Sequence, residues 1–547
     1  MTDVGHQQVL NLVNHAFRQA DIRIVNSSVR QFPGETIVVV EVAPSDFAAA
    51  LTIASDLDSQ IPDGFVTIRK VQEASKASFG RAQSLIDPRV NDLIELLNAR
   101  SRTSEQQPSL HYIHDAAETL NVAMSRRHHL IFGRRGVGKT ALMLEAKSLL
   151  EKRGAMTFWI NIQTMRSLSA YEAFLTIASR LCDLPERVHY GRSKQPISVG
   201  TATSIKSRIS TLLSSGKVDR RQVDLLIPDI HQLFLVLGQE TQTDLYIFLD
   251  DLHYLSMAEQ PALLEKINAI SRDIRIWIKA AGIRHQSRWF TDNPPTGLQT
   301  GHDAGIINLD VTLEQPAKAK GFLSSILNSY AAEAKLGSVF GTISREALDR
   351  LVLASGGVPR DFLILSATTI QVARQRTNAK SARVQDVNES AGRIAQIKLQ
   401  ELEDDAASSL GRAEARIEVL NRLREFLLET KQVTYFRIDF RDKETHQKEY
   451  ELLQSLMDLR LIHLINASVS DERQAGHKSE VYMLDLSQFS GMRFKRNLKV
   501  LDFTRDHLVL KDTGGPAAPR PGDTPKRLLS ILRRGPALDL AALTAFT

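Results

Sequence analysis

The chain has 547 residues, of which 43% are hydrophobic and 24% charged, and it carries a single cysteine. This length predicts several domains, and one cysteine excludes a disulfide framework or a cysteine-rich zinc site. No apolar run reaches the roughly 18–20 residues that span a bilayer, and the N-terminus lacks the pattern of a secretory signal. We therefore expect a cytoplasmic protein without a membrane partner. The net charge of +6 is compatible with nucleic-acid binding but equally with an ordinary solubilising surface.

Residues 1–80 predict a small α/β domain. Helical spacing of apolar residues in QQVLNLVNHAFRQA is followed by two strand-like runs joined at PGE, a second helix and a third strand. This order is typical of a sheet with one helical face. The segment contains no catalytic cluster, so a docking or regulatory role is favoured. Residues 81–104 predict a helical linker.

The segment GRRGVGKT, residues 133–140, has the form of a phosphate-binding loop, G-x-x-x-x-G-K-[ST]. It follows the apolar run HHLIF and precedes ALMLEAKSLLEKRG, whose apolar residues have helical spacing. A strand, a glycine-rich loop and a helix in this order are the setting in which the motif binds nucleotide. The alternative is a glycine-rich turn without a ligand.

The residue types of this loop fit the chemistry of ATP. Glycines let the backbone curl so that its N–H groups face the phosphates, helped by the positive end of the following helix. Lys139 places a positive charge at the β- and γ-phosphates, and Thr140 offers its hydroxyl to Mg²⁺. The motif assigns no role to Arg134 and Arg135, and solvated loop positions would account for them. We assign nucleotide binding to Gly133, Gly136, Val137, Gly138, Lys139, Thr140 and Ala141.

A P-loop needs an acidic partner, which DLYIFLDDLHYL (244–255) supplies. The run LYIFL predicts a buried strand that ends in Asp250 and Asp251. At the carboxyl end of a parallel strand, these carboxylates reach the crevice in which α/β ligands bind. Asp250 is expected to hold Mg²⁺, and Asp251 to orient the attacking water as a catalytic base. A capping or solvated-turn role is the alternative for such a pair.

Strand and helix patterns alternate through residues 105–305, which predicts an α/β fold with a parallel, doubly wound sheet. Residues 306–405 are mainly helical, and residues 410–505 form a further mixed unit. Residues 506–547 contain a Gly- and Pro-rich stretch and predict a flexible basic tail.

With these motifs the chain resembles the AAA+ and STAND classes of P-loop ATPases, and most closely the origin-recognition-like AAA+ group. The resemblance covers roughly residues 105–505 and rests on GRRGVGKT, LYIFLDDLHYL and ASGGVPRDFLIL (354–365). It implies an ATPase core followed by a helical lid. It also implies that Arg360 is a catalytic sensor-2 arginine that reaches the γ-phosphate from the lid. A helix break with a solvent-facing Arg360 is the alternative.

The chain departs from this family pattern after the acidic strand. The next strand, IRIWIKAAGI, offers only Lys279 as a polar sensor-1 residue. Arg284 and Arg288 are placed suitably for an arginine finger donated to a neighbouring subunit. A surface role is the alternative for each arginine.

Residues 410–505 predict a helix, a short strand, a helix and a two-stranded hairpin, which resembles the winged helix that origin-recognition-like ATPases carry after the lid. In a DNA-binding version the second helix enters the major groove and the hairpin tip meets phosphates. Here this helix carries Lys448 with Glu449, Glu451 and Asp458, whereas the hairpin loop and RFKRNLK (493–499) are more basic. Contact with double-stranded DNA and docking to a protein stand as equal alternatives, and the basic KRLLSILRR near the C-terminus fits either.

The sequence thus predicts an ATPase that uses ATP and Mg²⁺, assembles as a nucleotide-dependent homo-oligomer, and acts on DNA or a nucleoprotein partner. The alternative is a STAND-like switch, in which nucleotide exchange activates a protein effector without binding DNA. A small-metabolite kinase is less favoured, because the additional domains are superfluous for such an enzyme.

Overall fold

The computed structural model describes residues 2–32, 35–58, 60–61, 64–70, 82, 84–99, 113, 119–187, 196–216, 218–407, 410–470, 477–490, 498–504, 507–512 and 525–543. The chain divides into two compact units. The first comprises Met1–Lys76, His114–Gly133 and Lys139–Leu309, and the second Ala77–Ile113, Arg134–Gly138 and Asp310–Thr547. Within the described residues, every helix is too short or too polar to cross a bilayer.

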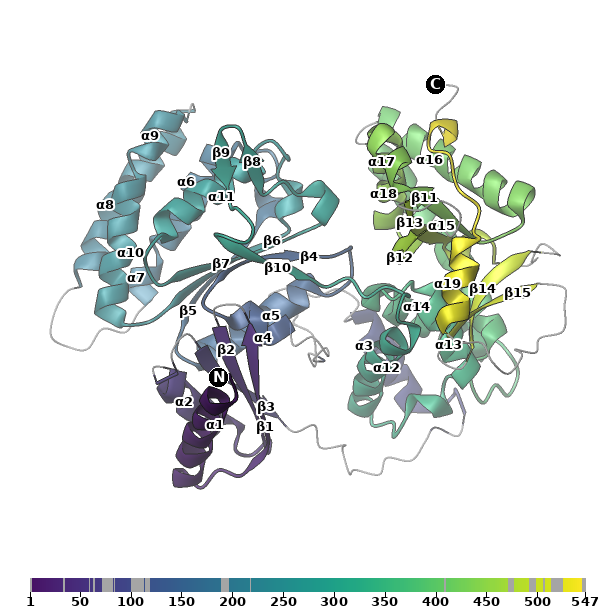
Figure 1. Ribbon diagram of the computed structural model, residues 1–547, viewed down its shortest axis with the longest axis horizontal. Helices are drawn as coiled ribbons and strands as arrows, with labels where there is room; N and C mark the ends of the chain where they lie inside the picture. Colours follow the sequence, from purple (N-terminus) through teal and green to yellow (C-terminus); the bar gives the residue numbers. More distant parts are fainter. Residues whose placement is uncertain are drawn as a thin grey trace. The chain divides into compact units, whose positions relative to one another are not determined.

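The first unit is built on a five-stranded sheet in the order β10-β4-β7-β6-β5, in which every neighbouring pair is parallel (Figure 1). The predicted α/β class with a parallel sheet is therefore confirmed. Strand β6 is buried at every residue, as its continuous apolar sequence predicts. The strands are β4 (His128–Phe132), β5 (Met156–Asn161), β6 (Leu245–Asp250), β7 (Ile276–Gly282) and β10 (Ala304–Asn308).

Helices cover both faces of this sheet, with α4 and α5 on one face and α6, α10 and α11 on the other (Figure 1). Local signals define their ends: Ser169 and Glu172 form a reciprocal capping box at the start of α6. The bounds are α4 (Thr119–Met124), α5 (Lys139–Lys152), α6 (Ala170–Leu181), α7 (Leu184–Arg187), α8 (Ile197–Ser214), α9 (Arg220–Asp224), α10 (Ile227–Thr241) and α11 (Gln260–Ser271). Short elements complete the unit: η1 (Ile162–Met165), η2 (Leu252–Tyr254), η3 (Arg284–Gln286), and the hairpin of β8 (Phe290–Asp292) and β9 (Pro295–Gly297).

The N-terminal domain has the predicted order of a helix, two strands, a helix and a strand. Strand β2 pairs with β1 in antiparallel and with β3 in parallel orientation. Val13 and Phe17 of the first helix and Leu51 of the second are buried against the valines of β2. The elements are α1 (Thr2–Gln19), β1 (Ile24–Phe32), β2 (Glu35–Val42), α2 (Phe47–Asp58) and β3 (Gly64–Lys70).

The N-terminal domain packs against α4 and against the C-terminal end of α5. Thr67 of β3 donates a 2.9 Å hydrogen bond from its hydroxyl to the side-chain oxygen of Asn121 in α4. Arg153, directly after α5, donates to the Val66 carbonyl at 2.6 Å and lies over the ring of Phe65. The domain therefore contacts the end of the helix that begins at the P-loop.

The second unit begins with a helical layer. Helix α3 lies in the predicted linker but packs into the core of this unit through Leu93 and Leu97. The linker therefore contains a folded element, because the apolar face of α3 is covered by its neighbours α12 and α14. The helices are α3 (Pro88–Ala99), α12 (Pro316–Glu333), η4 (Val339–Gly341), α13 (Arg345–Ala354), α14 (Pro359–Arg374) and α15 (Val384–Ala407). We call α12–α15 the lid helices.

The C-terminal subdomain, residues 410–543, follows the lid helices. Its sheet has the order β11-β13-β12 and is antiparallel throughout. A second hairpin, β14–β15, follows, which sequence reasoning missed. The elements are α16 (Leu410–Arg424), a π-helical segment (Glu425–Lys431), β11 (Tyr435–Asp439), α17 (Phe440–Thr445), α18 (Gln447–Asp458), β12 (Ile462–Ser470), β13 (Lys478–Leu484), η6 (Leu486–Gln488), β14 (Lys499–Thr504), β15 (His507–Asp512), α19 (Pro525–Arg533) and η7 (Ala541–Leu543).

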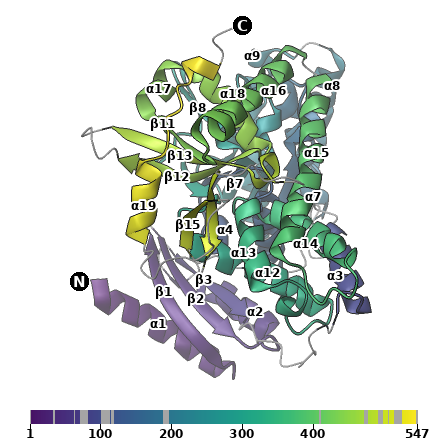
Figure 2. The ribbon, with the colours of Figure 1, turned by 90° about the vertical axis from the view of Figure 1, so that its right-hand side faces the viewer.

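The prediction of a flexible tail over residues 506–547 is wrong for the part that the structure describes. Helix α19 packs beside β12 and β15, with Leu532 only 1% exposed (Figure 2). The chain then pairs with the edge of β11, where Arg437 N donates to Pro536 O and Leu538 N donates to Arg437 O. The apolar residues spaced along this segment bury against the C-terminal subdomain and hold it. The Gly- and Pro-rich stretch of residues 513–524 lies outside the described residues.

We predict that Leu532→Ala destabilises the second unit by about 2–5 kcal/mol, because it removes a buried side chain and leaves a cavity. Leu529, on the same helix but 39% exposed, provides the matched control, and Leu529→Ala should change stability by less than about 0.5 kcal/mol. Chemical unfolding followed by circular dichroism measures both. Equal effects of the two variants would contradict a packed helix α19.

Candidate nucleotide-binding site

The predicted phosphate-binding loop connects β4 to α5, so the motif has its strand, loop and helix. Gly136 and Gly138 have φ angles of +82° and +105°, a region that residues with a Cβ rarely adopt. These two glycines allow the chain to turn from the buried strand into a helix that begins at Lys139. Val137 is buried in this turn, and Ala141 is half-buried in the first turn of α5.

Lys139 is held close to the start of the loop. Its side chain is largely buried, and its Nζ donates a 2.7 Å hydrogen bond to the carbonyl oxygen of Gly133. A buried ammonium group with a carbonyl partner is a positive charge that an anion can share. The structure therefore places the Lys139 ammonium group beside Gly133, at the start of the loop.

The structure brings the acidic strand end to the first turn of α5. Thr140 Oγ1 donates a 2.9 Å hydrogen bond to Asp250 Oδ2, although the two residues are 110 positions apart. The Asp251 backbone N–H donates to the other oxygen of Asp250 at 3.0 Å. Burial, and next the charge of Asp251, raise the pKa of Asp250 to about 7.

Asp251 lies at the turn that ends β6. Its backbone is left-handed, with φ 60° and ψ 40°, which is uncommon for a residue with a side chain and often marks a functional position. Its side chain is 27% exposed, whereas Asp250 is 2% exposed. His253 lies nearby, with its Nδ1 4.0 Å from Asp251 Oδ1. The two neighbouring carboxyl groups therefore have different environments.

Arg134 is not a solvated loop residue, so that interpretation is wrong for this arginine. It is only 4% exposed. Its backbone N–H and its Nε both donate to Asp310 Oδ1, at 2.9 and 3.2 Å. Its Nη2 donates to the carbonyl oxygens of Val311 and Gly356, at 3.1 and 3.3 Å. The guanidinium group thus ties the loop to the segment before α12 and to the end of α13; the neighbouring Arg135 is half-buried.

Arg360, in the second position of α14, also meets the loop. Its backbone N–H donates to Gly136 O at 3.2 Å. A Cβ added at Gly136 would lie 2.8 Å from Cβ of Arg360 and 3.1 Å from Cγ1 of Val358. The glycine is therefore needed for close approach as well as for its φ angle. The residues of the loop and of GGVPR that the sequence singled out are in contact within the second unit.

Lys279 does not lie at the carboxyl end of its strand, so it is unsuited to a sensor-1 role. It pairs in register with His129, near the start of β4, whereas Gly282 pairs with the last residue, Phe132. Its Nζ donates to the carbonyls of Ser125 and Arg127, both at 2.7 Å, and lies 3.0 Å from His129 Nδ1. Burial, and next the charge of Lys279, hold the pKa of His129 well below its usual value, so the neutral ring can accept this bond.

Arg284 and Arg288 are both exposed after β7. The guanidinium carbon of Arg284 lies 5.9 Å from the centre of the Phe132 ring and 5.8 Å from that of Trp289. Phe132 is the last residue before the P-loop. Arg284 is thus beside the start of the loop, which the sequence could not indicate, because no spacing rule links residues 132 and 284.

Neither a protein-family model nor a curated protein sequence matches this chain. Among solved structures, Aeropyrum pernix Orc1 in complex with DNA is similar over 74% of this chain and 93% of that chain, at 15% identity and a TM-score of 0.33. The Thermotoga maritima RuvB Holliday junction branch migration motor is similar over 60% of this chain and 85% of that chain, at 13% identity and a TM-score of 0.27. A katanin structure is similar over 53% of this chain and 80% of that chain, at 13% identity and a TM-score of 0.25. These TM-scores lie below 0.5, so the similarities support no statement about the function of this chain.

We predict that Lys279→Met lowers the free energy of unfolding of the first unit by about 1–3 kcal/mol, because buried carbonyl groups lose their donor. ATP affinity should not change. Tryptophan fluorescence reports on this unit during unfolding, since Trp159, Trp277 and Trp289 all belong to it. Lys152→Met, at the exposed end of α5, is the control. Loss of ATP hydrolysis with unchanged stability would instead restore a sensor role.

Proposed function

We propose that the chain is an AAA+-like ATPase that binds and hydrolyses ATP and uses the resulting conformational change on a macromolecular partner. The observation that carries this proposal is the contact of Thr140 with Asp250. It joins the end of a phosphate-binding loop to the carboxylate of a separate strand, as a site for a nucleotide and its cation requires. Asp250 and Lys139 are both buried beside this contact, and burying charged groups is costly for a purely structural role.

The nucleotide would bind at the loop and the start of α5. Backbone N–H groups of residues 136–141 and the positive end of the helix favour the phosphates. Lys139 would exchange its bond with Gly133 for a phosphate oxygen. Because these groups bind charge rather than a base, they suit a triphosphate and leave the choice of base to other contacts.

The donor set fits Mg²⁺, which prefers oxygen ligands. Thr140 supplies a hydroxyl and Asp250 a carboxylate, and the raised pKa of Asp250 reflects a buried acid that a divalent cation would compensate. Thr140 and Asp250 would hold the ion. When bound, Mg²⁺ supplies positive charge that stabilises the phosphates during cleavage.

Asp251 would orient the attacking water and accept its proton. It is more exposed than Asp250 and lies at the carboxyl end of β6, where a water can approach. Arg360 would stabilise charge on the γ-phosphate, as the family resemblance implies. Its backbone contact with Gly136 O supports a role in which the lid responds to the state of the loop.

Two observations support a winged helix in the C-terminal subdomain. Its elements follow the order helix, strand, helix, helix, strand, strand, and its sheet has the strand order β11-β13-β12. We propose that this subdomain contacts the partner, with DNA or a nucleoprotein as the first candidate. We also propose that nucleotide binding promotes assembly of the chain into a homo-oligomer. The exposed Arg284 and Arg288 are the candidates for contact with a neighbouring subunit.

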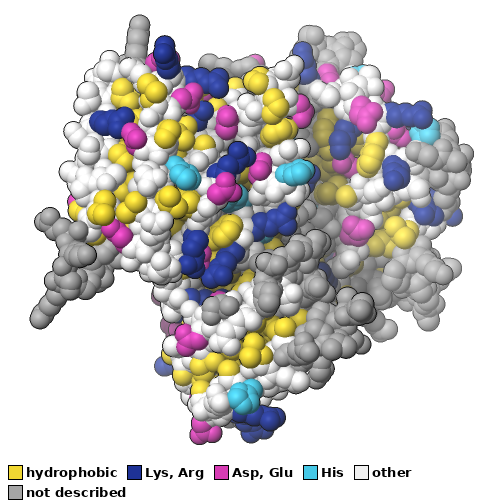
Figure 3. All heavy atoms as spheres, turned by 60° about the vertical axis from the view of Figure 1, so that its left-hand side comes forward, with side chains coloured by type: hydrophobic (Ala, Val, Ile, Leu, Met, Phe, Trp, Pro, Cys, Tyr) yellow, Lys and Arg dark blue, Asp and Glu magenta, His cyan; other side chains and the backbone are white. Residues whose placement is uncertain are grey.

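One observation favours the second candidate, a STAND-like switch with a protein effector. The most exposed charged residues of α18 are Lys448 and Glu451, and Glu449 is half-exposed. A helix with a mixed surface suits a protein partner at least as well as phosphates. On the face drawn in Figure 3, Lys and Arg side chains are likewise interspersed with Asp and Glu. Arg473 and most of RFKRNLK lie outside the described residues.

We predict that Lys139→Ala abolishes ATP binding, measured with a fluorescent ATP analogue, because the phosphates lose their buried cation.

Asp251→Asn should retain binding but lower kcat by about 10²-fold or more, since the amide cannot accept the proton. Lys152→Ala and Asp273→Asn are the controls. Asp273 also has a left-handed backbone, with φ 60°, but it precedes β7. Wild-type affinity of Lys139→Ala would exclude this nucleotide site.

The DNA candidate predicts that affinity for a duplex falls steeply with salt, by about 0.9 log units per log unit of salt for each phosphate contact. Lys478→Ala, at the exposed start of β13, should reduce this slope by about 1, whereas Lys152→Ala should not. Binding curves with ATP at several salt concentrations measure it. Nucleotide-driven assembly without any DNA affinity would favour the protein effector instead.

A further inference from the structure

The second unit contains a buried group of charged side chains that the proposed chemistry does not use. We call it the His463 cluster; it comprises Asp361, Lys398, Arg460, His463 and Asp485. All except Arg460 are at most 5% exposed. They come from the lid helices α14 and α15 and from the C-terminal subdomain around β12 and β13. The cluster therefore joins two parts of the chain that the sequence predicts to be separate domains.

The members of the cluster alternate in charge. His463 Nε2 lies 2.6 Å from Asp485 Oδ2, and Lys398 Nζ lies 3.3 Å from the other oxygen of Asp485. Lys398 also lies 3.6 Å from Asp361 and donates to the Arg460 carbonyl at 2.9 Å. Arg460 in turn pairs with Asp361 at 2.9 Å. Two carboxylates thus face two cations, which is the condition under which charges are tolerated in a protein interior.

The pairing fixes the state of Asp485 and His463. Burial alone would raise the pKa of Asp485, but Lys398, His463 and Ser487 hold it below its usual value. Burial lowers the pKa of His463. A neutral ring that donates from Nε2 to Asp485 leaves Nδ1 as an acceptor, and Nδ1 has no hydrogen-bond partner among the described residues.

The Nδ1 side of the His463 ring faces Gly356, which follows helix α13. A Cβ added at Gly356 would lie 2.0 Å from His463 Nδ1, so the ring occupies the space of a side chain there. The carbonyl of Gly356 accepts the bond from Arg134 of the P-loop. The Gly356 peptide is therefore positioned between His463 of the C-terminal subdomain and Arg134 of the loop.

The same segment carries Arg360. It runs from Gly356 to Asp361, so that one end contacts His463 and Arg134 and the other end, Asp361, is a member of the cluster. Between them, Arg360 N donates to Gly136 O. A shift of the loop thus has two direct contacts through which it reaches this segment.

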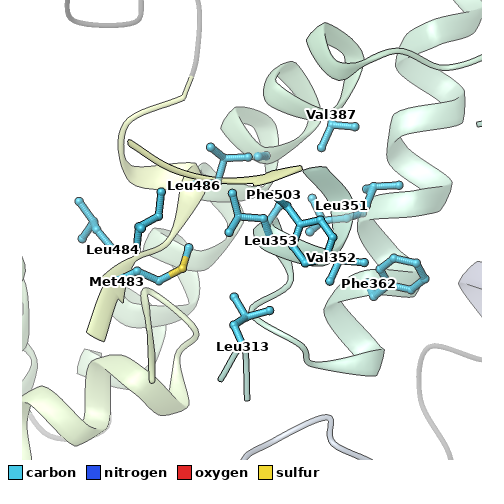
Figure 4. Close-up of a cluster of buried hydrophobic side chains, with 14 of the residues drawn as sticks. Leu313, Leu351, Val352, Leu353, Phe362, Val387, Met483, Leu484, Leu486 and Phe503 are labelled. Atoms are coloured by element: carbon cyan, nitrogen blue, oxygen red, sulfur yellow. The ribbon is translucent and has the colours of Figure 1, made fainter. Parts of the chain in front are cut away.

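Apolar packing makes the connection stiff. Leu351, Val352 and Leu353 of α13 belong to the same buried group as Leu484 of β13 and Phe503 of β14 (Figure 4). Interiors packed in this way switch between discrete arrangements instead of deforming gradually. A displacement of the lid helices therefore moves β13 with them.

We infer that Arg134 and His463 are positioning residues that couple the P-loop to the C-terminal subdomain through Gly356–Asp361. Nucleotide at the loop changes the arrangement of β12 and β13, and a partner bound to the C-terminal subdomain changes nucleotide affinity by the same factor. This inference rests on the proposed nucleotide site. It adds to the proposed function the residues that transmit the conformational change, and it adds control of nucleotide affinity by a partner bound to the C-terminal subdomain.

Hydrogen exchange of the full chain with and without a non-hydrolysable ATP analogue tests the coupling. In the wild type, the analogue should change amide exchange in Ile462–Ser470 and Lys478–Leu484 at least about fivefold. His463→Ala should bind the analogue within about threefold of wild-type affinity and lose this response. His463→Gln, which keeps a donor for Asp485, should recover it in part.

The matched control is His446→Ala. His446 forms another histidine–aspartate pair in the same subdomain, with its Nδ1 2.7 Å from Asp442 Oδ1, but its side chain is 33% exposed. This variant should keep the response. A full response in His463→Ala, or a wild type that binds the analogue without any response, overturns the coupling. A wild type that does not bind the analogue overturns the nucleotide site itself, and the two failures are thereby distinguished.

A double-mutant cycle tests the contact directly. Gly356→Ala should lower ATP affinity about tenfold, because its Cβ collides with His463 and displaces the carbonyl that Arg134 uses. In the His463→Ala background the same change should have less than about a threefold effect, since the space is then open. The strain of alanine at φ +56° is common to both backgrounds and cancels. Equal effects in the two backgrounds overturn the inferred contact.

Discussion

The parallel sheet brings Thr140 and Asp250 within hydrogen-bond distance, and it places the rest of the candidate site at the same edge. Strands β4 and β6 run in the same direction with only β7 between them. The loop after β4 and the aspartates at the end of β6 consequently emerge at one edge. Thr140 is in the first turn of α5, so its hydroxyl points back to this edge and meets Asp250. The same geometry leaves Asp251 on a tight, partly exposed turn.

Local sequence signals predict the elements around the P-loop and in the N-terminal domain, and they single out the residues at this edge. The apolar run before Asp250, the spacing of the glycines and the helical pattern after Thr140 each depend on neighbours in the chain. The α/β class and the element order of the N-terminal domain followed from the same signals. Pairing across the sheet is what places the residues together, and a parallel sheet permits few alternatives.

Features that depend on distant contacts were not predictable. Arg134 has no neighbour in sequence that reveals Asp310 or Gly356 as partners, and an arginine in a polar loop reads as solvated. Lys279 is polar in an apolar strand, but only the register with His129 shows which end of the sheet it serves. The sequence predicts a flexible tail for residues 506–547 because this segment contains a stretch rich in glycine and proline. Leu532, Leu538 and Leu540 nevertheless bury there, since a partner surface exists elsewhere in the chain.

The pairing of residues 536–538 with β11 has a consequence for the solubility of the protein. Without it, the outer edge of the β11-β13-β12 sheet would present unpaired backbone groups, to which a strand of another chain can add. Residues 536–538 therefore cover part of the β11 edge, which discourages strand-to-strand association between copies there. Any assembly of copies would then have to use surfaces other than this sheet edge.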